Sequence, residues 1–150
     1  MQVRPYGSGR FVLVIDRGEE VIASLTSFLE ERDIRGACLS GIGAVKDIVL
    51  GYFDVEKKEY AKRTFDEVME LGNLSGLTGF ADGKPVPHLH ATVAGPEMIS
   101  FTGHLFRAEA AVAVEIVLTD LSDEIPRVPD KDTGLKLVRL SPGAPDRSEG

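Results

Sequence analysis

The sequence has little material for covalent cross-links or membrane spans. Cysteine occurs once among its 150 residues, as Cys38, and tryptophan is absent. A single cysteine excludes an intrachain disulfide, and no apolar run reaches the ~18 residues that a membrane-spanning helix needs. Residues 1–5 also lack the apolar segment of a secretory signal. These absences predict a soluble cytoplasmic protein that does not associate with membranes.

Positive charge is also scarce. Seventeen Lys and Arg residues stand against 24 Asp and Glu, which gives a net charge of −7. Such a molecule repels phosphate backbones and anionic membrane surfaces at long range. The one basic cluster is interleaved with Glu56, Glu59 and Asp66, and it consists of Lys57, Lys58, Lys62 and Arg63. A mixture of this kind is typical of a solvated hairpin, so the residues predict no direct DNA binding.

The length and composition predict one domain. Hydrophobic residues make up 43% of the chain and charged residues 27%, which is ordinary globular composition. Residues 141–150 carry almost nothing that a core could bury. We therefore expect a single domain over residues 1–140, followed by a flexible C-terminal tail over 141–150.

One segment has the apolar period of a helix. Its apolar side chains recur at helical spacing at Val21, Ile22, Leu25, Phe28 and Leu29. This spacing predicts an amphipathic helix over roughly residues 18–32. Asp16 and Glu19 are placed to form a capping box at its start, and Gly36 is an end signal.

The remaining pattern is that of strands. Short apolar or alternating runs, separated by Gly, Pro and Asp, predict strands near residues 11–15, 37–42, 46–54, 58–65, 68–74, 87–94, 98–105 and 110–119, with an edge strand near 135–140. Their close spacing favours antiparallel pairing. The predicted class is α+β, a mostly antiparallel sheet with one main helix. Cys38 lies between apolar neighbours and is predicted to be a small buried side chain.

The three histidines of the chain, His88, His90 and His104, lie within one short segment. Side chains alternate between the two faces of a strand, so His88 and His90 project from the same face. Gly95-Pro96 is the only turn signal before His104, and a hairpin centred on Pro96 places His104 directly opposite His88. The spacing thus predicts three imidazoles that converge on one point.

The alternation of side chains along this hairpin supports the prediction. The polar face carries His88, His90, Thr92, Ser100, Thr102 and His104. The apolar face carries Leu89, Ala91, Val93, Ile99, Phe101 and Leu105. Such a pattern indicates one face in the core and a polar, histidine-lined face opposite.

Three imidazoles form a donor set that suits zinc, and three protein ligands with an open fourth position are typical of catalytic zinc sites. We therefore predict that His88, His90 and His104 bind zinc or another divalent transition metal, with nickel, iron and copper as chemical alternatives. The simpler alternative is that the histidines only form hydrogen bonds with neighbours, on an exposed face or at a subunit interface.

Two carboxylates interrupt apolar strands, Glu70 and Glu115. A buried carboxylate is costly unless it is paired or metal-bound. Each is a candidate fourth ligand, a partner that orients a histidine, or a general acid or base. The alternative is that each lies on a solvated face or pairs with an arginine.

Six short segments, spread between about residue 10 and residue 140, carry a family resemblance. They are Gly18-Glu19-Glu20, Leu39-Ser40-Gly41-Ile42-Gly43-Ala44-Val45, Met69-Glu70-Leu71, His88-Leu89-His90, Gly103-His104-Leu105 and Val114-Glu115-Ile116. In order and spacing they resemble the plant- and prokaryote-conserved (PPC) domain. The resemblance implies a curved antiparallel sheet flanked by helix, a closed homotrimer, and metal binding through the residues that match His88, His90 and His104.

The resemblance also implies a regulatory or DNA-associated role, because plant members pair the domain with AT-hook arms and bind DNA. This chain has no Arg-Gly-Arg-Pro arm, and Gly72-Asn73 stands where the family has Leu-Ser. We expect a non-enzymatic, homotrimeric metal-binding protein with a regulatory role through contact with other proteins or DNA. The alternative is a small metal-dependent lyase or hydrolase that uses the same histidines, with Glu70 or Glu115 moving a proton.

Overall fold

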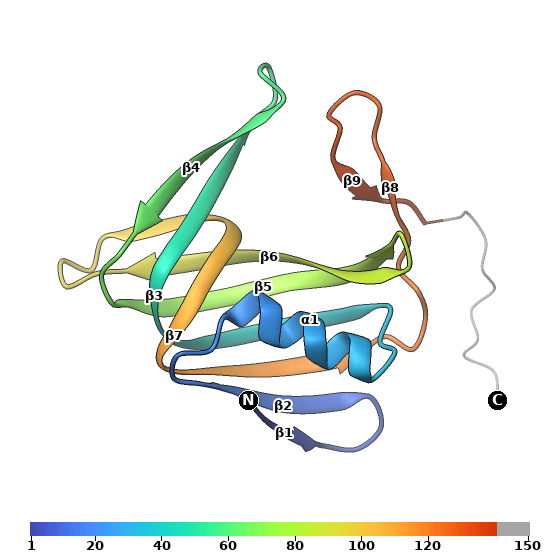
Figure 1. Ribbon diagram of the computed structural model, residues 1–150, viewed down its shortest axis with the longest axis horizontal. Coiled ribbons are helices and arrows are strands. Elements are labelled where there is room, and N and C mark those ends of the chain that lie inside the picture. Colours follow the sequence, from blue (N-terminus) through green and yellow to red (C-terminus); the bar gives the residue numbers. More distant parts are fainter. Residues whose placement is uncertain (141–150) are drawn as a thin grey trace.

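A computed structural model describes residues 1–140 (Figure 1), so the tail expected over 141–150 lies outside the described residues. The described chain forms a strand-rich α+β fold with one helix. In chain order its elements are β1 (Gln2–Pro5), β2 (Arg10–Asp16), α1 (Val21–Glu31), β3 (Ala37–Asp54), β4 (Glu59–Phe65), β5 (Met69–Ala81), β6 (Lys84–Ala94), β7 (Ser100–Asp120), β8 (Arg127–Pro129) and β9 (Lys136–Val138).

Seven strands form one antiparallel sheet in the order β1-β2-β7-β6-β5-β3-β4. The long strands β3 and β7 also pair with each other. This additional pairing closes β3, β5, β6 and β7 into a hydrogen-bonded ring, which leaves the edges of the sheet to β1 and β4. Strands β8 and β9 form a separate small hairpin.

Helix α1 lies against one side of this ring of strands, which forms a small barrel (Figure 1). Buried apolar side chains of the helix and of the strands form one core. Four apolar helix residues, Val21, Leu25, Phe28 and Leu29, are buried, as the helical period predicts. Burying each such side chain stabilises the fold by roughly 1.5–3 kcal/mol. The large strand residues that are also fully buried are Leu13, Ile15, Ile48, Leu74, Leu89, Ile116, Leu118, Val45 and Val93.

The helix cap differs from the prediction. Glu20 is the N-cap residue, and its carboxylate accepts a 2.6 Å hydrogen bond from the Ala23 amide. Glu19 instead accepts a 2.8 Å bond from the Asp16 amide and pairs with the amino terminus of Met1. One of the two hydrogen bonds of the predicted Asp16–Glu19 box is thus present. The other is missing because the Asp16 carboxylate accepts from Gln2 and pairs with the amino terminus of Met1.

Two pairs of predicted strands are in fact single long strands. Residues 37–42 and 46–54 both belong to β3, and most of 98–105 together with 110–119 belongs to β7, which begins at Ser100. Irregularities in the β3–β7 register, between Gly43 and Val45 and again between Lys46 and Leu50, absorb the breaks in the alternation. Bulges of this kind bend a strand without ending it.

The exposure of Cys38 is a further correction, because its side chain is exposed rather than buried. The neighbouring residues Ala37 and Leu39 are buried, and alternation sends Cys38 to the opposite face of β3. The apolar neighbours were therefore misleading. Helix α1 covers only one face of the sheet, and the outer face, which carries Cys38, Ile42 and Val117, is not covered by any described element.

Candidate metal centre

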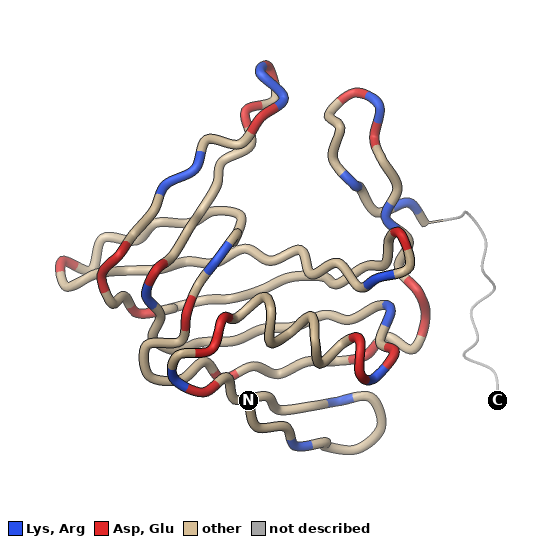
Figure 2. The backbone as a smooth tube through the Cα atoms, viewed as in Figure 1, with Lys and Arg blue, Asp and Glu red and all other residues tan. Residues whose placement is uncertain are grey.

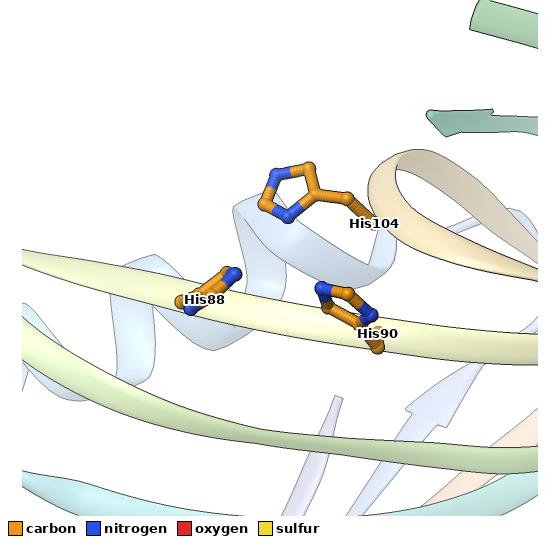
Figure 3. A group of neighbouring side chains, drawn as sticks. All are labelled: His88, His90 and His104. Atoms are coloured by element: carbon orange, nitrogen blue, oxygen red, sulfur yellow. The ribbon is translucent and has the colours of Figure 1, made fainter. Parts of the chain in front are cut away.

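Strand β6 and the first part of β7 bring the three histidines together. His88 and His90 are two positions apart on β6, and His104 on β7 is the cross-strand partner of His90. The ring centroids lie 5.3 Å apart for His88 and His90, 5.1 Å for His88 and His104, and 5.7 Å for His90 and His104. Figure 3 shows the three rings turned toward one another. One nitrogen from each ring lies within 4.8 Å of the others.

The predicted register of this hairpin is wrong by two residues. His104 lies opposite His90, not His88. The turn is longer than a tight turn on Pro96, because Met98 adopts a left-handed φ of 57° and its amide donates to the Gly95 carbonyl. The shift moves the pairing by two residues along one strand, so both histidines keep their face.

The predicted separation of faces is confirmed with one exception. Leu89, Ala91 and Val93 on β6, with Leu105 on β7, are buried in the core. The histidines lie on the other face, beside Thr92 and Thr102, whose hydroxyl groups are 2.8 Å apart. Ile99 was expected in the core but is 62% exposed. It belongs to the turn, where alternation no longer applies.

Aromatic rings enclose His104. The centroid of its imidazole is 5.2 Å from that of Tyr60 and 4.7 Å from that of Phe106. Gly51 is the β3 partner of His104, and a Cβ atom at Gly51 would lie only 2.4 Å from the Phe106 ring. The absence of a side chain at Gly51 therefore lets both aromatic rings pack beside the histidine.

Burial lowers the pKa of two of these imidazoles, His88 and His104. The pKa of His104 is lowered to about 4, chiefly by desolvation and to a smaller extent by His88, His90, Arg127 and Lys62. Desolvation also lowers the pKa of His88, with smaller contributions from Arg127 and His90. Metal ligands must be deprotonated, and a neutral imidazole meets that condition near neutral pH.

One unsatisfied atom fits a metal ligand. The Nδ1 atom of His104 is buried and has no hydrogen-bond partner among the described residues. An unpaired buried nitrogen is costly unless something binds it. Three imidazoles, one of which has such an atom, fit a divalent transition metal as a donor set.

The two candidate carboxylates are not part of the cluster. The group of residues within ligand distance of one another contains the three histidines and neither Glu70 nor Glu115. Glu115 is exposed and borders a depression of about 340 Å³ on the outer sheet face, with Val12 and Ile42. Glu70 is exposed near the start of β5, opposite Ala94. Each therefore follows the alternative prediction of a solvated face.

Two of the histidines, His88 and His104, border a cavity of about 230 Å³. Its wall includes Tyr60 from β4, Arg127 from β8 and Leu137 from β9, together with His88 and His104. The hairpins β3–β4 and β8–β9 project from the same side of the barrel, and β6 crosses between their bases (Figure 1). Segments far apart in the sequence thus form one small pocket beside the three histidines.

Sequence reasoning missed two residues of this pocket, Tyr60 and Arg127. Tyr60 lies within the basic cluster that predicts a charged, solvated hairpin, and nothing in that pattern distinguishes it as a pocket residue. Arg127 lies outside every strand that the sequence predicts, yet it begins strand β8 and is buried.

The fold and its site define a small closed β-barrel with a three-histidine cluster beside a pocket. The sequence model of a protein family, the Plants and Prokaryotes Conserved (PCC) domain, also written PPC, matches residues 5–122. The chain therefore belongs to this family, as the sequence motifs indicate. Strands β8 and β9 lie beyond the matched residues.

Solved structures of similar proteins agree. A metal-containing protein from Archaeoglobus fulgidus is 39% identical, with a TM-score of 0.82, covering 93% of this chain and 100% of that one. A "putative DNA binding protein" from Bacteroides thetaiotaomicron is 30% identical, with a TM-score of 0.88, covering 92% and 96%. A PPC protein from Pyrococcus horikoshii is 29% identical, with a TM-score of 0.81, covering 93% and 95%.

A comparison with curated proteins found no match. Within residues 1–140, no helix is long and apolar enough to span a bilayer.

Proposed function

We propose that this PCC-domain protein binds one divalent transition metal, zinc, per chain through His88, His90 and His104. The observation that carries the proposal is the convergence of three imidazole nitrogens, all within 4.8 Å of one another. Support comes from the unpartnered Nδ1 of His104 and from the lowered pKa of its ring. The similar Archaeoglobus protein is described as metal-containing.

The residues of this chain fix what such a centre can do. His90 is the exposed ligand, and His88 and His104 are half-buried, so the ion would sit at the surface of the sheet, with one side toward the pocket. When bound, zinc supplies Lewis acidity to an oxygen at its open position. No described carboxylate joins the cluster, so that position is left to water or to a small molecule.

A binding role is favoured over catalysis. A metal-dependent lyase or hydrolase needs a group that moves a proton, and Glu70 and Glu115 lie elsewhere. The one feature that favours the enzyme as a second candidate is the cavity beside the histidines. We infer a non-enzymatic protein with a regulatory role, in which the metal centre serves structure or ligand binding.

We do not assign direct DNA binding to this chain. The similar Bacteroides structure is described as a "putative DNA binding protein", but the net charge of this chain is −7. Figure 2 shows Lys and Arg spread over several elements, with Asp and Glu beside them at the tip of the β3–β4 hairpin. A regulatory role is then expected to act through a protein partner.

We also propose the homotrimer that the family resemblance implies. Its support in this chain is the uncovered outer sheet face, where Ile42 and Val117 are 57% and 52% exposed. Apolar side chains on a sheet that nothing covers favour association with further copies.

Cobalt substitution tests the metal site. The metal-free protein is titrated with Co²⁺, whose absorption in the visible range is strong in tetrahedral sites with nitrogen ligands and weak in water. We expect saturation at one equivalent per chain, displacement by zinc, and loss of the signal in His90→Ala. Thr92→Ala, on the same face, is the matched control and should behave as the unchanged protein does. A titration that gives the same weak signal in both variants and in the unchanged protein would refute the proposal.

A further inference from the structure

Arg127 is a buried cation without an anionic partner in residues 1–140. Its side chain is only 8% exposed, and no ion pair among the described residues includes it. Nη1 donates 3.0 Å to the Lys136 carbonyl and Nη2 donates 3.3 Å to the Leu77 carbonyl, while Nε has no partner. Neutral carbonyls do not cancel a charge, and a buried unpaired charge is costly.

The guanidinium group lies beside the histidines. Leu77, which accepts from Nη2, is the direct cross-strand partner of His88. Arg127 and His88 also line the same cavity of about 230 Å³. Gly79 makes room for the arginine, because a Cβ atom there would lie 2.8 Å from both Cγ and Nε of Arg127.

The cavity has the character of a site for a small anion with an apolar body. Among residues 1–140, its charged lining residues are Arg127 and Lys136, and no acidic side chain lines it. The Lys136 ammonium group is already paired with Asp82, so Arg127 is the cation left to a ligand. The rest of the wall is largely apolar, through Val86, Leu135 and Leu137.

We propose that this pocket binds a small organic carboxylate, whose carboxylate group pairs with Arg127 and whose other end lies toward the three histidines. Arginine presents its N–H donors in a planar fork that matches the two oxygens of a carboxylate. The role of Arg127 stands on its own, and only the contact with a bound metal rests on the proposed function. Arg127 lies outside residues 5–122, so it does not belong to the segment that the family model matches.

A carboxylate fits better than a phosphate. Two of the five N–H donors of the guanidinium are used by carbonyl groups, and the remaining ones suit a planar monoanion. A phosphate near neutral pH carries more charge, and sites for it usually gather several cations or backbone amides. This wall offers one uncommitted cation among apolar side chains.

The test is calorimetric titration of the full chain with L-lactate as the carboxylate probe, on zinc-loaded and on metal-free protein. Lactamide, which has the same shape without the charge, and inorganic phosphate are titrated in parallel. The variants are Arg127→Gln and, as a matched control, Arg139→Gln, whose side chain is 59% exposed and pairs with Asp130. Thermal unfolding and zinc content are measured for each variant.

We expect lactate to bind the unchanged protein and Arg139→Gln with equal affinity. Its affinity for Arg127→Gln should be lower by a factor of about ten or more, because a charge-assisted pair is lost. Zinc content should be the same in all three. Lactamide and phosphate should bind more weakly than lactate to the unchanged protein, a comparison that holds even where Arg127→Gln does not fold.

Equal lactate affinity in Arg127→Gln and the unchanged protein would overturn the proposal, as would tighter binding of phosphate or lactamide than of lactate. Failure to bind zinc, read from metal content, would refute the metal site alone. If lactate binds the metal-free protein and this binding still depends on Arg127, the result would support a carboxylate site that is independent of the metal site.

Discussion

His90 and His104 are direct cross-strand partners on β6 and β7, with ring centroids 5.7 Å apart. Their distance is therefore fixed by antiparallel pairing, and His88 joins them because it is two positions from His90 on the same face. The cluster follows from the sheet register rather than from a loop. Rigid elements of this kind hold a site more accurately than loops do.

Gly51→Ala tests the packing that supports His104. The new Cβ would lie 2.4 Å from the Phe106 ring, so we expect a loss of about 1–3 kcal/mol in the free energy of unfolding, measured with urea. Gly72→Ala is the control, since its nearest heavy atom would be 3.9 Å away. Equal stability of the two variants would show that the rings near His104 are loosely packed.

The free energy of unfolding of the metal-free protein should decrease as the pH is lowered. Burial lowers the pKa of His104 from 6.5 to about 4, so between these values the unfolded chain binds the proton more readily. The contribution of this group is present above pH 6.5 and is lost as pH falls toward 4. Urea unfolding should show a smaller loss over this window in His104→Gln than in the unchanged protein. An identical loss in both would mean that His104 titrates normally.

The oligomeric state is a separate prediction. Analytical ultracentrifugation should give three times the mass of one chain at micromolar concentration. Val117→Lys places a charge on the uncovered outer face and should shift the protein toward monomer. Val55→Lys, which changes another exposed valine in the β3–β4 turn, should leave the trimer intact. A stable monomer of the unchanged protein would contradict the expectation.

Specific binding to duplex DNA is not expected at about 150 mM salt. The net charge is −7, and the chain has few clustered Lys and Arg residues that could pair with phosphates and release their counterions. Fluorescence anisotropy with labelled duplexes measures this directly. Sub-micromolar, sequence-dependent binding, retained when Lys57, Lys58, Lys62 and Arg63 are changed to Glu, would show that the assembled surface gathers positive charge elsewhere.

The sequence predicted the parts of the fold and site that depend on periodicity. The apolar spacing located helix α1, and alternation placed His88, His90 and His104 on one face. The register of the hairpin was wrong, because the conformation of Met98 that lengthens the turn leaves no signal in the sequence.

Other features depend on tertiary contacts that periodicity does not report. The continuity of β3 and β7 arises from bulges that two paired strands share, and a single strand does not reveal them. Glu70 and Glu115 were candidates because of apolar neighbours, yet alternation turned both outward. Arg127 lies near the histidines because the segment before β8 packs beside β5. There the Phe80 amide donates a hydrogen bond to the Ile125 carbonyl.

The central claim is that three histidines bind one metal ion, and metal content after reconstitution with zinc tests it most directly. Plasma emission spectrometry of the dialysed protein should give close to one zinc per chain for the unchanged protein and for Thr92→Ala. The double variant His90→Ala, His104→Ala should give almost none, with its fold checked by circular dichroism. Zinc content that is unchanged in the double variant, or absent from the unchanged protein, would contradict the account.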